Sequence, residues 1–332
     1  MMSFFATSGH RKCLKALFIV LTLLVSQSEK SWADTATADV SGFCYSNQPA
    51  EIRRCGEAAD AGSATAQIVM GQRYRDGSGV PQNLFLAKNY LSQAAEQSEA
   101  AILILAGVLL GSEYAEVNDF GAGLEWLTRL SNSNYEPYQR YAASWLGNIH
   151  YWGWYGVERD TSVAAHWIKL GAELGDPESL ELLGNLYLSG DEVPQNYALA
   201  RETWRRAAEL GSDHAAYSLG LSFENDRHGD RDFNAAMYWM VIAAKNNYGM
   251  AQFMLGQWYE RGIGMPQNHE TAHMWYNIAA AGSNAELFRS MRDGLASSMT
   301  NAQIARAQAR ASSCMASDFE HSDCQIPDVS LQ

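Results

Sequence analysis

The sequence predicts an all-α protein, a right-handed α/α solenoid of about six helical hairpins with capping helices at the N- and C-terminal ends. A glycine recurs at steps of 36 to 40 residues, and an Asn or Asp follows each glycine after 12 or 13 residues. The glycines are Gly71, Gly107, Gly147, Gly184, Gly220 and Gly256, and the Asn or Asp residues are Asn83, Asp119, Asp160, Asn196, Asp232 and Asn268. A period of this length is typical of helical repeats, in which each hairpin buries its apolar face only by stacking on its neighbours.

The clearest repeat runs from Ala251 to Gly282 and is predicted to form two short helices. Ala251, Leu255 and Tyr259 are spaced by four residues, so they share one face of the first helix. A turn rich in glycine and proline ends that helix. Asn268 follows the turn, where its side chain can cap the free N–H groups of the second helix.

The second helices carry a small residue four positions after the cap and a large one seven positions after it. The residues at the large position are Tyr90, Trp126, Trp167, Thr203, Trp239 and Trp275. Thr203 departs from the rule, and we expect the neighbouring Trp204 to compensate. The small residues should let helices approach closely, and the large ones should fill the space between hairpins.

This pattern resembles the Sel-one-like repeat (SLR) family, a relative of the tetratricopeptide repeats. The family pattern is A-x-x-x-L-G-x-x-Y-x-x-G-x-G-V, an Asp or Asn, A-x-x-W-Y and A-A-x-x-G, and repeats one, four and six match it closely. Repeat three carries one inserted residue, and repeats two and five lack the glycine-rich turn. The resemblance covers residues 57–315 and implies an adaptor or regulator, often of a bacterial cell envelope, and rarely an enzyme.

Residues 1–33 are predicted to be a secretory signal peptide that is cleaved after Ala33. Three Lys and Arg residues precede ten apolar residues at 16–25, and Ser31 and Ala33 provide the small side chains of a cleavage site. A membrane anchor is the alternative, but a spanning helix needs about 20 apolar residues. We therefore expect a periplasmic or secreted protein with no membrane insertion after cleavage.

The rest of the chain divides into four parts. Residues 34–62 should form an N-terminal cap that contains a half repeat, and residues 63–282 should form the six repeats. Residues 283–315 should form C-terminal capping helices, the second of which has the capping-box pair Thr300 and Gln303. Residues 316–332, rich in Ser and Asp, are expected to be a loop or a disordered tail.

Four cysteines remain after the predicted cleavage. An even number in an exported chain indicates disulfides, and the two pairs lie at opposite ends of the solenoid. We therefore predict the bonds Cys44–Cys55 and Cys314–Cys324, each of which would stabilise a cap by about 2–3 kcal/mol on the loop-entropy model. A metal site is the alternative, although neither pair has the C-x-x-C spacing of a zinc site.

The charge of the chain restricts its partners. The net charge is −13, and the segment predicted to be cleaved carries net positive charge. An acidic chain without a basic run is unsuited to nucleic acid and to anionic membrane surfaces. A basic or neutral segment of a protein is the better partner.

Two features raise the alternative of a cell-wall-associated hydrolase or binding protein. His269, Glu270 and His273 form an H-E-x-x-H string, which in zinc peptidases supplies two ligands and a base. Here His269 falls in the first, frayed turn of a repeat helix and no third ligand is evident, so we predict no metal, no cofactor and no catalytic residue. Some SLR proteins are described as β-lactamase-like, but they carry a Cys pair in each repeat, and the S-x-x-K, S-D-N and K-T-G motifs are missing from this sequence.

The candidate binding surface is the face of the first helices that lies opposite their core face. Residues three before and one after each repeat glycine should line a concave groove. The candidates are the amides Gln72, Asn148, Asn185 and Gln257, which could hold the backbone of an extended peptide, and the apolar anchors Tyr217, Leu221 and Phe253. Alternatively, the aromatic residues pack between adjacent first helices.

A second candidate is the aromatic loop Tyr151–Tyr155, with Trp152 and Trp154. It either packs against repeat four or offers an exposed contact to a partner. Taken together, the sequence predicts an exported, monomeric adaptor or regulator that binds an envelope protein or peptide in its groove.

Overall fold

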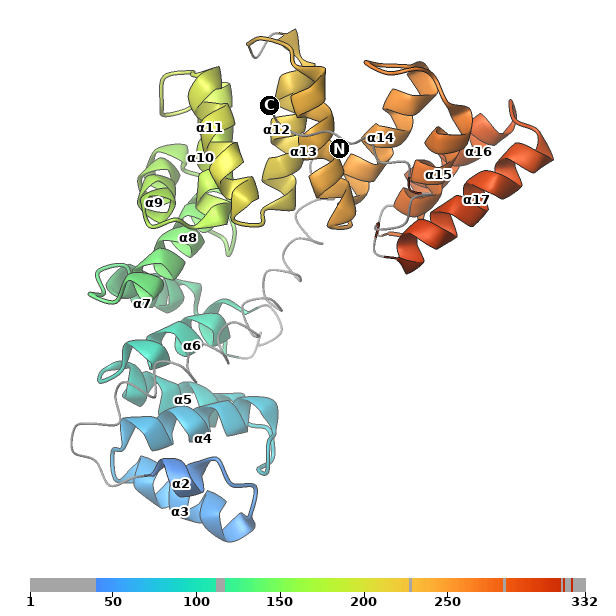
Figure 1. Cartoon of the computed structure of the whole chain (residues 1–332). Helices are drawn as coiled ribbons and strands as arrows, with labels where there is room; N and C mark the ends of the chain where they lie inside the picture. Colours follow the sequence, from blue (N-terminus) through green and yellow to red (C-terminus); the bar gives the residue numbers. More distant parts are fainter. Residues whose placement is uncertain are drawn as a thin grey trace. The chain divides into compact units, whose positions relative to one another are not determined.

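The computed structural model describes most of the chain between Val40 and Cys324. The described residues are 40–111, 117–226, 229–282, 285–317, 319 and 324, so the predicted signal peptide and nearly all of the predicted tail lie outside them. Within these ranges the chain forms 16 α-helices and no strand (Figure 1). None of the described helices is long and apolar enough to cross a membrane.

The chain divides into two compact units, Met1–Trp167 and Ile168–Gln332. The helices of the first unit are α2 (Ser41–Cys44), α3 (Pro49–Asp60), α4 (Ala64–Asp76), α5 (Leu84–Ala95), α6 (Glu99–Leu110), α7 (Phe120–Leu130) and α8 (Glu136–Trp152). Helix α9 (Thr161–Glu173) includes the boundary between the units. The helices of the second unit are α10 (Pro177–Ser189), α11 (Tyr197–Glu209), α12 (Asp213–Glu224), α13 (Phe233–Lys245), α14 (Gly249–Arg261), α15 (His269–Ala280), α16 (Ala285–Ala296) and α17 (Asn301–Ala316).

This architecture is the predicted all-α solenoid. The six repeats correspond to the helix pairs that begin at α4, α6, α8, α10, α12 and α14. Within each unit the two helices of a hairpin lie side by side, as α12 and α13 do (Figure 1). Helices α2 and α3 precede the first hairpin, and α16 and α17 follow the last.

All six predicted helix caps are present. Each Asn or Asp side chain accepts a hydrogen bond of 3.0–3.1 Å from the backbone N–H three residues later. The backbone N–H of each cap residue donates in turn to a carbonyl near the end of the first helix, at 2.8–3.2 Å. In repeats one, four and six, the preceding glutamine also donates to the carbonyl seven residues earlier, at 2.7–2.9 Å. The turn of each hairpin is therefore closed by local bonds.

In repeats one, four, five and six, the repeat glycine packs against the residue eight positions after the cap, one position later than the predicted large residue. A Cβ on Gly184 would lie 2.5 Å from Nε1 of Trp204, and a Cβ on Gly256 would lie 2.5 Å from Cε1 of Tyr276. The residues at this eighth position are at most 2% exposed: Leu91, Leu127, Ile168, Trp204, Met240 and Tyr276. Trp204 thus occupies a regular position, and the expectation that it compensates for Thr203 is wrong.

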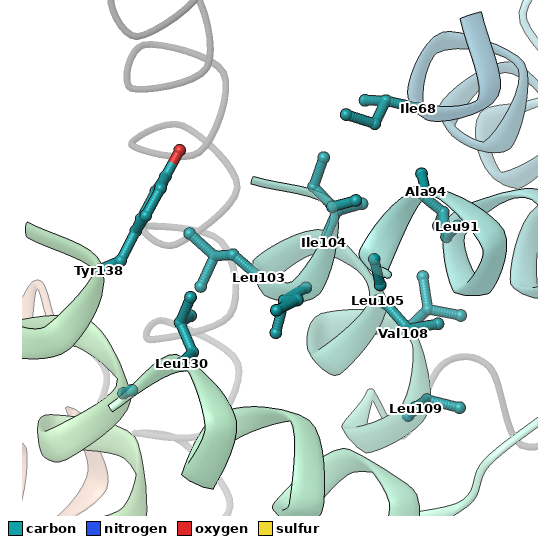
Figure 2. Close-up of a cluster of buried hydrophobic side chains, with 14 of the residues drawn as sticks. Ile68, Leu91, Ala94, Leu103, Ile104, Leu105, Val108, Leu109, Leu130 and Tyr138 are labelled. Atoms are coloured by element: carbon teal, nitrogen blue, oxygen red, sulfur yellow. The ribbon is translucent and has the colours of Figure 1, made fainter. Parts of the chain in front are cut away.

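Repeat two uses a different close approach. No atom lies within 4 Å of a Cβ built on Gly107, whereas a Cβ on Gly123 of α7 would lie 2.8 Å from Cγ of Leu110. Helix α6 is apolar nearly all round, and its Leu103, Ile104 and Leu105 are at most 3% exposed. Figure 2 shows these side chains between residues of α4 and α5 on one side and residues of α7 and α8 on the other. This cluster forms part of the core of the first unit, beside two others around the N-terminal disulfide and around Leu146.

The N-terminal cap is held by a disulfide and by a buried arginine. Cys44 of α2 and Cys55 of α3 are disulfide-bonded, as predicted, and both are fully buried. The guanidinium of Arg73, on α4, donates to the carbonyls of Cys44 at 2.9 Å and Ser46 at 2.6 Å, and also to the Ser78 carbonyl and the Asn47 side chain. Arg73 therefore ties the disulfide loop to the first repeat.

The C-terminal cap combines the predicted capping box with the second disulfide. The side chains of Thr300 and Gln303 close the box at the start of α17. Cys314 at the end of α17 is bonded to Cys324, again as predicted. Between these cysteines, the ring of Phe319 stacks on Trp275 of α15, with 6.0 Å between ring centroids. Phe319 therefore covers Trp275 of the last repeat.

Candidate functional site

In repeats one, two, four and five, the residues three before the repeat glycine lie between neighbouring first helices rather than in an open groove. In the first unit, Ile68 and Ile104 belong to the core shown in Figure 2. In the second unit, Glu181 contacts the start of α12, and Tyr217 contacts the residue that caps α14. The aromatic residues at this position therefore pack against the next helix, which is the alternative to partner binding given in the sequence analysis.

Phe253 is the clearest correction. Its side chain is 8% exposed, and its ring lies 5.1 Å from that of Phe288 and 5.6 Å from that of Tyr276. Phe288 belongs to α16, which covers Phe253 as the next first helix would. The expectation that Phe253 anchors a partner is wrong, because the capping helix takes that place.

The residues one position after each glycine are half-buried at five of the six repeats, namely Gln72, Asn148, Asn185, Leu221 and Gln257. In the first unit the row is interrupted by Val108, which is 1% exposed. The Asn148 side chain also donates to the carbonyl of Ser144 in its own helix, at 3.0 Å. The predicted amide row is thus not continuous in the first unit, while Asn185, Leu221 and Gln257 reach the surface of the second.

The second unit brings together a polar and aromatic cluster that the repeat pattern did not predict as a whole. Glu181 of α10 receives hydrogen bonds from Ser212 Oγ at 2.8 Å and from His214 Nδ1 at 2.7 Å. The His214 ring lies edge-on to Tyr248 at 5.8 Å, and Tyr217 lies 5.3 Å from Tyr248, all measured between ring centroids. The cluster thus connects α10, α12 and the start of α14.

We call this surface the first-helix face. It consists of Glu181, Asn185, His214, Tyr217, Leu221, Tyr248 and Gln257. His214 and Tyr248 were missed because they lie at the N-terminal ends of first helices, outside the two positions considered. The sequence did contain a signal for this position, because Ser212 and Tyr248 are 36 residues apart and so occupy the same place in consecutive repeats. In the structure each of them contacts the preceding first helix.

Burial and charge shift the titration of this cluster. Burial lowers the pKa of His214, but the hydrogen bond and the negative charge of Glu181 outweigh it, so the pKa of His214 is raised above the ordinary histidine value. Burial raises the pKa of Tyr217, and the charge of Glu224 raises it further. The pKa of Tyr248 is also raised, mainly by burial and then by Tyr217, Glu181 and Asp213. The face is therefore acidic in character.

The aromatic loop is divided between surface and packing. Trp152, the last residue of α8, is 54% exposed and meets Tyr151 edge-on. Trp154 is half-buried, and Tyr155 packs on Phe120 of α7 with 5.4 Å between ring centroids. Of the two tryptophans singled out from the sequence, Trp152 is the one that is open to a partner.

The H-E-x-x-H string serves packing in this structure. His273 is 1% exposed, and its Nδ1 lies 2.9 Å from the Asn277 amide nitrogen. Burial lowers the pKa of His273, and the nearby Arg292 lowers it further. Glu270 forms an ion pair with Arg306 of α17. In the part of the chain that the structure describes, no group of three or more His, Cys, Asp or Glu side chains is placed to hold a metal ion.

Comparison with known proteins identifies the repeats. The family model described as Sel1 repeat matches residues 64–99, 140–176, 177–212, 213–248 and 249–284, which together exceed half of the chain. Repeat two is not among the matched segments, whereas repeat five is matched although it lacks the glycine-rich turn.

Three similar proteins illustrate the relationship. The chain is 30% identical over 246 residues to the chitin synthase regulator SKT5 of Saccharomyces cerevisiae. The aligned region covers 67% of this chain and 33% of SKT5. The structure of c5321, a protective antigen of uropathogenic Escherichia coli with an SLR fold, has a TM-score of 0.66 at 23% identity, covering 86% of this chain and 60% of that one. A Sel1 repeat protein from Oxalobacter formigenes has a TM-score of 0.61 at 26% identity, covering 84% and 75%.

The present chain thus spans about a third of the length of SKT5. The likeness to c5321 concerns the fold alone. The five matched segments and the shared solenoid architecture establish that the chain belongs to the Sel1 repeat family.

Proposed function

We propose that this protein is an exported adaptor or regulator that binds a partner protein through the first-helix face of its second unit. Sel1 repeat proteins in general bind protein partners. The similarity to a chitin synthase regulator supports a regulatory role of this kind. No bond chemistry is part of the proposal.

One observation carries the choice of surface. Tyr217, Tyr248 and His214 are held in ring contact by two consecutive hairpins, yet Tyr217 and Tyr248 are only half-buried and the His214 side chain is 48% exposed. Aromatic side chains fixed in advance lose little freedom on binding, which is why tyrosine is enriched in interfaces. The positions equivalent to Tyr217 in the first unit, Ile68, Ile104 and Ser144, are buried and offer no such ring.

The proposal of export rests on the sequence of residues 1–33 and on the two disulfides. Disulfides persist in oxidising compartments such as the periplasm or the cell exterior. We propose that the mature protein begins after Ala33, resides in one of these compartments and is monomeric. Mass spectrometry of the purified mature protein, with thiol alkylation before and after reduction, tests this: an intact N-terminus or four free thiols in the native protein would contradict it.

The binding surface is tested by photocrosslinking in intact cells that produce the protein. A photoreactive amino acid replaces Leu221 on the first-helix face, and a matched variant carries it at Leu199 of α11, a leucine that is 41% exposed on a second helix of the same unit. The proposal expects a discrete protein adduct from position 221 that is absent from position 199. Equal labelling at both positions, or none at position 221, would refute it.

A further inference from the structure

Two tyrosines and a histidine form an aromatic cluster on the first-helix face. The rings of Tyr217 and Tyr248 are tilted by 49°, with 5.3 Å between their centroids. The His214 ring lies 5.8 Å from Tyr248 and 6.4 Å from Tyr217. Two electron-rich ring faces therefore meet at an angle, next to a residue that can carry positive charge.

The acidic side chains that act on this aromatic cluster are Glu181, Asp213 and Glu224. Glu181 enters from α10 with 18% of its side chain exposed, and Asp213 and Glu224 belong to α12. Their fields act on the two phenols, Glu224 on Tyr217 and the other two acids on Tyr248. Asp213 also accepts a hydrogen bond of 2.6 Å from Asn246. Protonated His214 is the resident cation of the cluster, and it pairs with Glu181.

We propose that this aromatic cluster, together with Glu181, binds an arginine side chain of the partner segment. The proposal deepens the function proposed above and rests on it. A guanidinium stacks on the faces of tyrosine rings and pairs with a carboxylate in its plane, so it matches both the rings and the acid. The net charge of −13 on the chain favours the approach of a basic segment.

His214 sets a condition on this binding. When His214 is protonated it neutralises Glu181, and an incoming guanidinium must compete with it. Neutral His214 no longer cancels the negative charge of Glu181, so the carboxylate attracts the guanidinium of the ligand more strongly. Binding should therefore strengthen as pH rises through the titration of His214, and His214→Gln should remove most of that dependence.

The test uses two small probes of nearly the same shape, one positively charged and one neutral. N-acetyl-arginine methylamide and the neutral N-acetyl-citrulline methylamide are titrated into the full-length protein, with the NMR signals of the Tyr217 and Tyr248 rings as readout. The proposal expects shifts of both rings with the arginine probe and weaker, non-saturating ones with citrulline. Glu181→Gln should weaken arginine binding on the order of fivefold.

The control variant is Glu202→Gln, which removes the same charge from α11, where Glu202 is 47% exposed and pairs with Arg205. Equal weakening by the two variants would show that only net charge matters and would overturn the proposal. Equal binding of the two probes, or no binding of arginine, would also overturn it. If position 221 captures a partner whose crosslinked segment contains no arginine, this inference fails while the proposed function stands. If nothing is captured there, the proposed function fails.

Discussion

Substituting alanine for the repeat glycine should have opposite effects in repeats four and two. In Gly184→Ala the added methyl group would lie 2.5 Å from Nε1 and 2.6 Å from Cδ1 of Trp204. Trp204 has little freedom to move, because it is 2% exposed and its Nε1 donates to the Glu181 carbonyl at 3.2 Å. In Gly107→Ala the methyl group meets no atom within 4 Å.

The magnitudes follow from two opposing contributions. Overfilling a packed site destabilises by about 1–3 kcal/mol, whereas alanine is favoured over glycine inside a helix by about 0.5–1 kcal/mol. Gly184→Ala should therefore lower the free energy of unfolding of the second unit by about 1–2 kcal/mol. Gly107→Ala should raise that of the first unit by about 0.5–1 kcal/mol.

Hydrogen exchange monitored by mass spectrometry is the appropriate assay, because it reports the opening free energy of each unit separately, and a chain of two units need not unfold in one step. Peptides from α10 and α11 should exchange faster in Gly184→Ala, and peptides from α6 should exchange more slowly in Gly107→Ala. If the two variants shift stability in the same direction, the packing account of the repeat glycine is wrong.

Three further predictions concern the caps and the buried histidine. Arg73→Met leaves the carbonyls of Cys44 and Ser46 without their donor, so it should destabilise the N-terminal cap by about 2–4 kcal/mol. Limited proteolysis of the cap should then be faster. The control Arg54→Met, at a side chain that is 63% exposed, should leave the digestion rate unchanged. The double variant Cys314→Ser with Cys324→Ser should lower the free energy of unfolding by about 2–3 kcal/mol, as measured by urea unfolding. It should also release Phe319 from Trp275 and change the tryptophan fluorescence. An unchanged spectrum would show that Phe319 stays on Trp275 without the bond. Burial lowers the pKa of His273 in the folded protein below the unfolded pKa of 6.5. The contribution of neutral His273 to stability is therefore present above pH 6.5 and is lost as pH falls through the folded pKa. His273→Asn should flatten the acid side of a plot of urea midpoint against pH, and an unaltered slope would contradict this.

The hairpins were predictable because their signals are local. A helix cap needs only an Asn or Asp and the backbone three residues on, so Asn83 and Asn268 could be identified without knowing what packs around them. The capping box of Thr300 and Gln303 and the two disulfides follow from short sequence separations in the same way. The predicted boundary at residue 33 and nearly all of the tail predicted from residue 316 lie outside the described ranges, so these two calls stay predictions.

The binding face was harder to predict because it depends on how one hairpin is rotated against the next. A repeat position has the same local sequence context whether a neighbour covers it or not, and Tyr217 and Phe253 occupy the same position. Tyr217 meets the polar start of α14 and stays half-exposed, whereas Phe253 meets Phe288 of the capping helix and is buried. The difference lies in the following helix, and no pattern within a single repeat contains it.

The stacking of Phe319 on Trp275 has a consequence for assembly. A solenoid has no intrinsic last repeat, and a hairpin with an open apolar end is a template on which another chain can add end to end. Helices α16 and α17 already pack on the last repeat, and the ring of Phe319, close to the Cys314–Cys324 bond, covers Trp275 in addition. Release of Phe319 should therefore uncover apolar surface at this end of the chain and favour end-to-end association of copies.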